Sequence, residues 1–283
     1  VVTMVRNTEP LLVPFAGNSL VDGFKNLLRA RFARQASRHA DRIIAVSEHV
    51  REFLVDRWGI PVEKIGVVYH GVEQSVPESE MVRPEALKSE RYIFTAGSIR
   101  PARGLEDVIE ALSLLSGNEA SLTLAIAGKV DDGSQSYKRR LDNLAQRLGV
   151  ATRIIWLGQL DAACMAWCYR NCDAFVMTSR AEACPNTALE AMSHGCRIVS
   201  TAQPPMPEFF RDCPLYYEPR NVAGLAGIIS HALSLSEDEA EKRRAAAVKR
   251  AAEFNWADTA RRTVDELEIA VQSESGAPFD SIT

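Results

Sequence analysis

The chain has 283 residues, of which 46% are hydrophobic and 25% charged, and its formal net charge at pH 7 is −4. This composition predicts one large or two small domains with a sizeable core, and the acidic balance argues against a general nucleic-acid binder. No apolar run is long enough to span a membrane, and we expect no signal peptide. The first of the six cysteines is Cys164, so the pattern is not that of a disulfide scaffold and fits a reducing cytoplasm.

The first part of the chain contains three short apolar runs that predict strands. They cover residues 1–5, 42–46 and 64–69, and each is rich in β-branched residues. Ser47 is a favourable N-cap, so a helix is predicted over 48–58. Three strands are too few for a complete α/β domain.

A basic amphipathic helix is predicted over 24–40, between the first two strands. Its apolar residues recur at every fourth position, as Phe24, Leu28, Phe32 and Ala36. Six basic residues and one Asp lie between Lys25 and Arg42. Two interpretations stay open. The helix packs on a core and exposes its basic face, or it lies on an anionic membrane surface.

The second part of the chain alternates strands with helices. A polar stretch that contains Pro77 and Pro84 precedes it and is predicted to be a linker. Strands are predicted over 92–96, 122–127, 153–157, 174–178, 197–201 and 215–217. This alternation predicts an α/β fold with a parallel, doubly wound, Rossmann-like sheet.

Three cysteines would share one face of a helix, because they are spaced four apart as Cys164, Cys168 and Cys172. Helical thiols at this spacing could bind a metal or fill small buried positions. No Cys-x2-Cys pair or nearby His completes a tetrahedral set, so we expect no metal site.

Two carboxylates bracket the loop and helix that follow the strand at 174–178. Glu182 lies in the loop, and Glu190 lies in the second turn of a helix predicted to begin at Pro185 and to end at Gly195. Carboxylates accept hydrogen bonds from sugar hydroxyls. The alternative is a pair of solvated glutamates at a helix start.

The start of the same helix is a candidate anion site. Its positive end and its first free backbone N–H groups attract phosphate. These N–H groups belong to Asn186, Thr187 and Ala188. A ligand with both a phosphate and a sugar would use the N–H groups and the carboxylates together.

A second candidate anion site follows the strand at 92–96. Arg103 is predicted at a helix N-terminus, where a cation opposes the helix dipole at a cost of ~0.3–1 kcal/mol. We therefore expect an anion to share the site. The alternative is that Arg100 and Arg103 are two surface arginines.

These motifs resemble the retaining nucleotide-sugar glycosyltransferases of the GT-B fold, family 4 (glycosyl transferases group 1). The Glu-x7-Glu pattern from Glu182 to Glu190, with Pro-Asn-Thr-Ala-Leu inside it, carries the resemblance. The loop at 97–104 resembles the family's Gly-Arg-Leu-x-x-x-Lys-Gly motif, whose Arg and Lys clamp the donor diphosphate. Arg103 matches the Lys, whereas Ser98 stands at the Arg position and Arg100 is the obvious substitute.

The resemblance implies a GT-B layout in which the start of the N-terminal domain is absent from this chain. Residues 1–74 would form a partial, acceptor-side domain, and 75–90 would be the linker. Residues 91–255 would form a complete nucleotide-sugar-binding domain, followed by a crossover helix over 256–271 and a tail over 272–283.

The resemblance also implies an activity and its residues. Glu182 and Arg103 would be catalytic. The donor-binding residues would be Gly97, Ser98, Arg100, Arg103, Asn186, Thr187, Ala188 and Glu190. The enzyme would transfer a sugar with retention, without metal or cofactor, to a glycan, lipid-linked or small acceptor.

Two other functions stay open at this point: a nucleotide-sugar epimerase, and a non-catalytic nucleotide-sugar binding module. The expected location is cytoplasmic, at the inner membrane face if the helix between Lys25 and Arg42 contacts lipid.

Overall fold

The computed structural model describes residues 1–7, 20–73, 76–88 and 90–275. By packing, the chain divides into two compact units, each described by itself below. The first comprises Val1–Gly71, Glu182–Cys184 and Phe254–Thr283, and the second Val72–Ala181 and Pro185–Glu253. Residues of the predicted linker from 76 to 88 are therefore grouped with the second unit, where Leu87 is buried.

The second unit is built on a six-stranded parallel sheet in the order β6-β5-β4-β7-β8-β9. The strands are β4 (Tyr92–Ala96), β5 (Thr123–Ala127), β6 (Ile154–Gly158), β7 (Ala174–Met177), β8 (Ile198–Thr201) and β9 (Leu215–Tyr217). The predicted doubly wound α/β fold is confirmed. Its strand order reverses between β4 and β7, which is where such sheets bind ligands.

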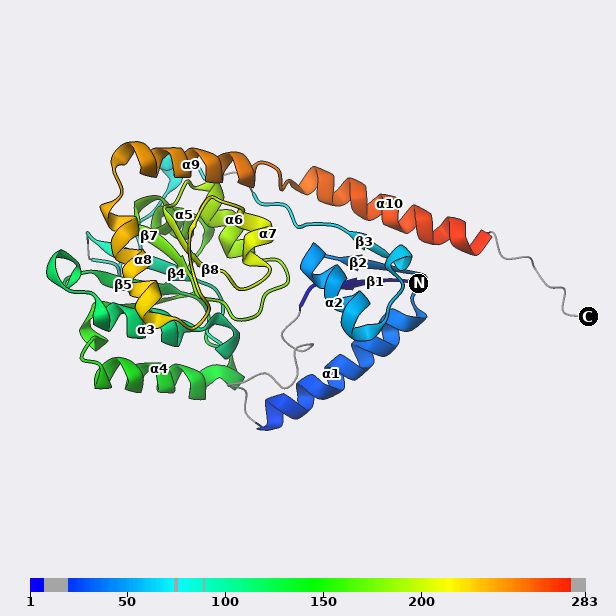
Figure 1. Cartoon of the computed structure of the whole chain (residues 1–283), viewed down its shortest axis with the longest axis horizontal. Coiled ribbons are helices and arrows are strands. Elements are labelled where there is room, and N and C mark those ends of the chain that lie inside the picture. The colour runs from blue at the N-terminus through cyan, green and yellow to red at the C-terminus, as the bar shows by residue number, and fades with distance from the viewer. Residues whose placement is uncertain (8–19, 74–75, 89, 276–283) are drawn as a thin grey trace, which may run out of the picture. The chain divides into compact units, whose positions relative to one another are not determined.

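Helices cover both faces of this sheet (Figure 1). They are α3 (Leu105–Leu114), α4 (Gln135–Arg147), α5 (Ala162–Asn171), α6 (Asn186–Ser193), α7 (Met206–Phe210), α8 (Val222–Ser234) and α9 (Glu237–Ala251). No helix was predicted over the α7 segment. Because strand side chains alternate, Ile93 joins the core under α3, α4 and α8, whereas the Phe94 ring packs on Tyr169 of α5, 5.2 Å between centroids.

The first unit contains a three-stranded parallel sheet in the order β1-β2-β3. Its elements are β1 (Val2–Val5), α1 (Leu20–His39), β2 (Arg42–Ala45), α2 (Glu48–Trp58), β3 (Ile65–Val67) and α10 (Trp256–Ser275). The predicted cap is confirmed, because the Ser47 hydroxyl accepts a hydrogen bond of 3.2 Å from the Val50 N–H. Ile43, Val50 and Leu54 are fully buried in the core of this unit.

Short 3-10 turns complete the described chain. They span Val62–Lys64, Glu78–Glu80, Pro101–Arg103, Gly117–Glu119, Asp132–Ser134 and Ala151–Arg153.

Helix α1 exposes to solvent the apolar face that a core-packed amphipathic helix would bury. Its apolar stripe is solvent-exposed, with Phe24 at 62% and Phe32 at 65% of their full exposure. The buried positions are small or polar instead, and include Asn26 and Ser37, while Ala33 packs against the core of the first unit. The core-packed interpretation of this stripe is therefore wrong.

Arg42 does not belong to the basic face of α1. It begins β2, and its side chain forms an ion pair with Glu266 of α10 and donates to the backbone oxygen of Glu63. A Cβ added at Gly66 would overlap the Glu266 carboxylate, so the glycine makes room for this ion pair. The last arginine of α1 is therefore Arg38, which His39 follows at the helix end.

Helix α10 continues to Ser275, so the predicted tail over 272–283 begins too early. The remaining part of that tail, 276–283, lies outside the described residues. Among the described helices, none combines the length and the apolar character needed to cross a membrane.

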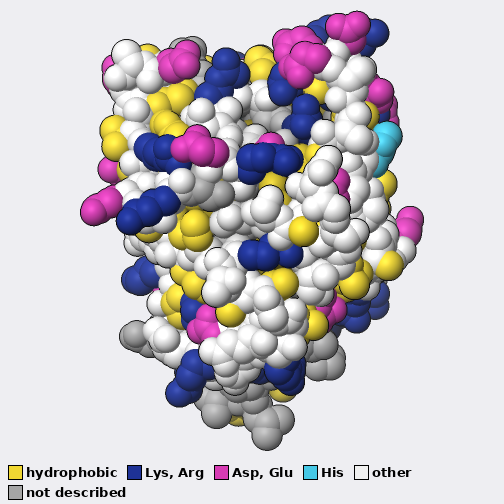
Figure 2. Space-filling view, turned by 90° about the vertical axis from the view of Figure 1, so that its left-hand side faces the viewer, with side chains coloured by type: hydrophobic (Ala, Val, Ile, Leu, Met, Phe, Trp, Pro, Cys, Tyr) yellow, Lys and Arg dark blue, Asp and Glu magenta, His cyan; other side chains and the backbone are white. Residues whose placement is uncertain are grey.

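One side of the molecule is viewed in Figure 2, where basic, acidic and hydrophobic side chains are interspersed. This mixture agrees with a chain of 33 basic and 37 acidic residues.

A buried ion pair ties the start of α3 to the end of β7. The Arg180 guanidinium lies 2.8 Å from Oδ1 of Asp107 and 3.5 Å from Oε2 of Glu106. The Asp107 side chain is 7% exposed and that of Arg180 is 21% exposed. Burial raises the pKa of Asp107, and Arg180 opposes this rise. Removing Arg180 would therefore leave a buried carboxylate without its cation.

We expect Arg180→Met to lower the free energy of unfolding by about 3 kcal/mol, the lower end for breaking a buried pair, because Arg180 keeps some solvent contact. Urea unfolding followed by circular dichroism measures the change. The matched control is Arg211→Met, which removes an exposed pair with Glu253 and should cost about 0.5 kcal/mol or less. Equal losses in the two variants would contradict a special role for the buried pair.

Candidate functional site

The ends of β4, β5 and β6 meet at glycines that allow unusually close backbone contact. Gly97, Gly128 and Gly158 all have positive φ values, and Gly128 N–H donates to Gly158 O over 2.7 Å. A Cβ added at Gly128 would lie 1.9 Å from the Gly97 carbonyl oxygen. Only glycine fits there, so these residues hold the carboxyl ends of the three strands together.

Gly97 also makes room for a guanidinium group. A Cβ added at Gly97 would lie 2.5 Å from Cζ of Arg103, so the Arg103 side chain lies directly over the glycine. Its Nη1 is 3.4 Å from the Ser179 hydroxyl, at the end of β7. The structure thus places the Arg103 charge across the carboxyl ends of β4 and β7, at the switch point of the sheet.

The loop that carries Arg103 is fixed to the end of β7. The Thr178 hydroxyl donates to Arg103 O and the Arg180 N–H donates to Ala102 O, both over 2.7 Å. A Cβ added at Gly104 would lie 2.5 Å from Thr178 O. Arg103 ends a 3-10 turn and Gly104 is the N-cap of α3, so Arg103 lies just before the helix rather than inside its first turn.

The start of α6 only partly matches the predicted set of free N–H groups. Pro185 is the N-cap, and the helix begins at Asn186. The Ala188 N–H donates to Pro185 O over 2.8 Å, so its prediction as a free donor is wrong. The Thr187 Oγ1 atom is buried and has no hydrogen-bond partner among the described residues. As predicted, Gly195 follows the helix end in the left-handed conformation.

Glu190 presents a half-buried carboxylate on α6. Its Oε2 accepts a hydrogen bond of 2.8 Å from the Tyr169 hydroxyl. Burial raises the pKa of Glu190, the Tyr169 hydrogen bond lowers it, the charge of Glu73 raises it, and that of Arg103 lowers it. Arg103 and Glu190 are therefore close enough to interact electrostatically.

Tyr169 is the functional candidate that the sequence pattern did not reveal. It lies on α5, is 1% exposed, and donates its hydroxyl to Glu190. Burial raises the pKa of Tyr169 well above its usual range, and the Glu190 charge adds to this rise. A single tyrosine in a helix gives no signal of its own, because the pairing with Glu190 depends on how α5 and α6 pack.

The other predicted site residues lie in different surroundings. Ser98 and Arg100 are half-buried, and Arg100 is the N-cap of the 3-10 turn that ends at Arg103. Glu182 is 8% exposed and is grouped with the first unit. The structure therefore brings Gly97, Arg103 and Glu190 together in the second unit, whereas Glu182 belongs to the first unit.

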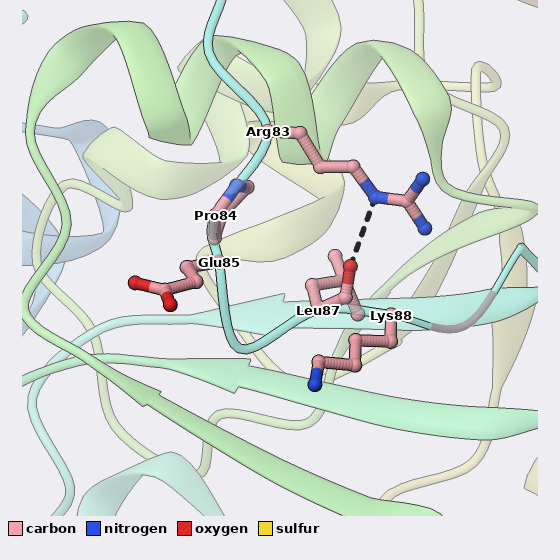
Figure 3. Close-up of a pocket in the computed structure, with 5 residues that line it drawn as sticks. All are labelled: Arg83, Pro84, Glu85, Leu87 and Lys88. Carbon is pink, nitrogen blue, oxygen red and sulfur yellow. Dashed lines mark hydrogen bonds between the residues drawn. The ribbon is translucent and has the colours of Figure 1, made fainter.

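A separate pocket of ≈310 Å³ is lined by residues of the predicted linker, shortly before β4 begins (Figure 3). Its lining residues are Arg83, Pro84, Glu85, Leu87 and Lys88. Arg83 donates to Leu87 O over 2.9 Å, and its guanidinium lies 5.2 Å from the Trp167 ring centre. This pocket shares no lining residue with the Arg103–Glu190 cluster.

Comparison with curated proteins finds distant relatives over most of the chain. The serotype-specific mannosyltransferase WbdA of Escherichia coli is 24% identical over 83% of this chain and 29% of its own length. The D-inositol 3-phosphate glycosyltransferase of Mycobacterium tuberculosis is 26% identical over 90% of this chain and 55% of its own length. The chain thus spans between about a third and just over half of these relatives.

Solved structures share the fold. HepE of Anabaena, in complex with UDP and glucose, superposes with a TM-score of 0.79 at 21% identity, over 94% of this chain and 71% of HepE. WaaG, a glycosyltransferase involved in lipopolysaccharide biosynthesis, superposes with a TM-score of 0.70 at 16% identity, over 88% of this chain and 70% of WaaG.

Two family models match consecutive parts of the sequence. The model described as Glycosyltransferase Family 4 matches residues 8–76, and the model of glycosyl transferases group 1 matches residues 78–253. The second match covers more than half of the chain and contains the whole Arg103–Glu190 cluster. The chain belongs to the glycosyl transferases group 1 family and has the GT-B type of α/β fold.

Proposed function

We propose that this chain acts in a glycosyltransferase that transfers a sugar from a nucleotide diphosphate-sugar to an acceptor. The observation that carries the proposal is the placement of a cation and a carboxylate, Arg103 and Glu190, at the switch point of the second unit. A nucleotide diphosphate-sugar carries both a diphosphate for the cation and sugar hydroxyls for the carboxylate.

Different residues of the cluster would bind different parts of the donor. Arg103 and the N-terminus of α6 neutralise the diphosphate, and the unpartnered Thr187 hydroxyl is a further donor for a phosphate oxygen. Glu190 accepts the ribose hydroxyls. Charge accumulates on the diphosphate as the sugar departs, so Arg103 stabilises the transition state more than the bound donor.

The finer features of the reaction rest on the family pattern. Glu182 would contact the donor sugar beside the anomeric carbon, with Arg100 assisting Arg103 at the diphosphate, and the sugar would be transferred with retention. Arg103 and the α6 N-terminus would take the place of a divalent cation, so the reaction would need no metal or other cofactor. The complexes of HepE with UDP and UDP-glucose support a nucleotide-sugar donor, and the acceptor is left unassigned.

Two other functions make different predictions. Binding of a nucleotide-sugar without turnover, even in a longer chain, would favour a non-catalytic binding module. Epimerisation of the donor's sugar in the absence of any acceptor would favour a nucleotide-sugar epimerase.

The donor site is tested by calorimetric titration with UDP, GDP and ADP in the absence of metal. We expect saturable binding of at least one nucleotide. Arg103→Ala and Glu190→Ala should each weaken it by about 10- to 100-fold, because each removes charge-assisted hydrogen bonds worth ~1.5–3 kcal/mol.

The matched control is Arg139→Ala, which removes an exposed arginine of α4 outside the cluster. It should leave the affinity within about twofold of the parent. If both cluster variants bind as tightly as the control, the donor-site assignment is wrong.

We also propose that α1 contacts an anionic membrane surface, at the cytoplasmic face if the enzyme uses a lipid-linked acceptor. Phe24 and Phe32 are solvent-exposed, and exposed basic residues, among them Arg31 and Arg34, lie on the same helix. An exposed apolar stripe flanked by cations is complementary to an anionic lipid surface.

Sedimentation with vesicles of phosphatidylcholine containing phosphatidylglycerol tests this contact. We expect binding that weakens in high salt and that falls at least about tenfold in a Phe24→Ser, Phe32→Ser double variant, because each ring loses its burial in lipid. Leu114→Ser is the matched control, since it removes an exposed apolar residue of the second unit. Equal binding by all three proteins, or self-association through α1 instead, would contradict the membrane proposal.

A further inference from the structure

The hydroxyl of Tyr169 is held at one place by the core of the second unit. Its ring is packed on Phe94, Phe175 and His194, with centroid distances of 5.2, 5.5 and 5.3 Å. The side chain is 1% exposed, so the hydroxyl cannot turn toward solvent. Its hydrogen bond of 2.8 Å to Glu190 Oε2 is therefore set by packing rather than by chance contact.

The backbone around this pair fixes α5 against the end of α6. The Tyr169 carbonyl accepts from Sγ of Cys196 over 3.0 Å and from Sγ of Cys172 over 3.4 Å. Nδ1 of His194 lies 2.9 Å from the Glu190 carbonyl oxygen. These contacts hold the backbone at both ends of the Tyr169–Glu190 hydrogen bond.

The hydrogen bond uses only one of the two carboxylate oxygens. Oε1 of Glu190 accepts no hydrogen bond from the residues that the structure describes. A ligand hydroxyl can therefore bind Oε1 while Tyr169 keeps Oε2. One oxygen of the Glu190 carboxylate would thus be held by the protein, and the other would be open to a ligand.

The surroundings of Glu190 would otherwise disfavour its ionised form. Burial and the charge of Glu73 raise the pKa of Glu190, whereas Arg103 and the Tyr169 hydrogen bond lower it. Arg103 is also the group expected to meet the diphosphate. Both Arg103 and Tyr169 stabilise the carboxylate, but a bound donor would engage only Arg103. Tyr169 would therefore keep its hydrogen bond to Glu190 when the donor binds.

We propose that Tyr169 is a positioning residue for the donor site, whose hydroxyl holds Oε2 of Glu190 so that Oε1 is oriented to accept a ribose hydroxyl. The proposal rests on the donor-binding role of Glu190 given above. Tyr169 would act only through Glu190 and would not contact the donor.

Tyr169→Phe tests this role, because it removes the hydroxyl and keeps the ring in its aromatic surroundings. We expect the pKa of Glu190 in the free protein to rise, since a hydrogen bond to the charged form is lost. NMR titration of the Glu190 side-chain carboxyl carbon measures this without any ligand. An unchanged Glu190 titration would overturn the proposal.

The second readout is affinity as a function of pH. For the tightest binder among UDP, GDP and ADP, we expect Tyr169→Phe to lose about tenfold in affinity near neutral pH. The loss should grow as pH falls, because a raised pKa protonates Glu190 at a higher pH. The ratio of parent to variant affinities cancels the titration of the nucleotide itself. A ratio independent of pH would indicate a merely structural role.

Two further variants separate the possible failures. Tyr92→Phe also removes one hydroxyl hydrogen bond of a buried tyrosine, to Cys168 O, at the opposite end of β4. This control should leave the Glu190 titration and the affinity unchanged. In a Glu190→Gln background, Tyr169→Phe should add little further loss, and a full additional loss would overturn the proposal. If no nucleotide binds the parent, the donor site itself is wrong, and the NMR titration then shows only whether the Tyr169 hydroxyl stabilises the Glu190 carboxylate.

Discussion

The proposed donor site depends on two places where backbone segments approach so closely that only glycine fits. Gly128 lies against the carbonyl of Gly97, and Gly104 lies against the carbonyl of Thr178. The first contact joins the ends of β4 and β5, and the second joins the loop after β4 to the end of β7. Since Arg103 is carried by that loop and lies over Gly97, its position depends on this backbone geometry.

Two opposite charges lie at the switch point of the sheet, where the glycine contacts hold the backbone in place. Arg103 interacts electrostatically with Glu190, while the hydrogen bond to the Glu190 carboxylate comes from Tyr169. In the proposed donor site, the Arg103 guanidinium would bind the diphosphate through charge-assisted hydrogen bonds. The Asp107–Arg180 pair stabilises the same loop from its other side, at the start of α3.

Much of the fold follows from sequence periodicity. The strands of the second unit agree with the predicted ranges to within one residue at each end, because buried parallel strands are short apolar runs bounded by turn residues. Arg103 and Glu190 were also predicted, since each lies in a recognisable motif next to a strand. Tyr169 and the donated Ala188 N–H were not predictable in this way. The first depends on the packing of α5 on α6, and the second on the geometry at Pro185.

Helix α1 shows where periodicity stops being informative. The spacing of Phe24 and Phe32 predicts an apolar stripe, and the stripe exists, but spacing carries no information on what covers it. The core of the first unit contacts α1 through Ala33, and Ala40, directly after the helix, is buried in the same core. Small side chains at these positions let the helix approach closely. When a helix packs through its small residues, its large apolar side chains stay exposed and can contact a lipid or protein surface. The choice between a lipid surface and a protein surface then depends on the flanking charges, and the basic residues of α1 favour anionic lipid.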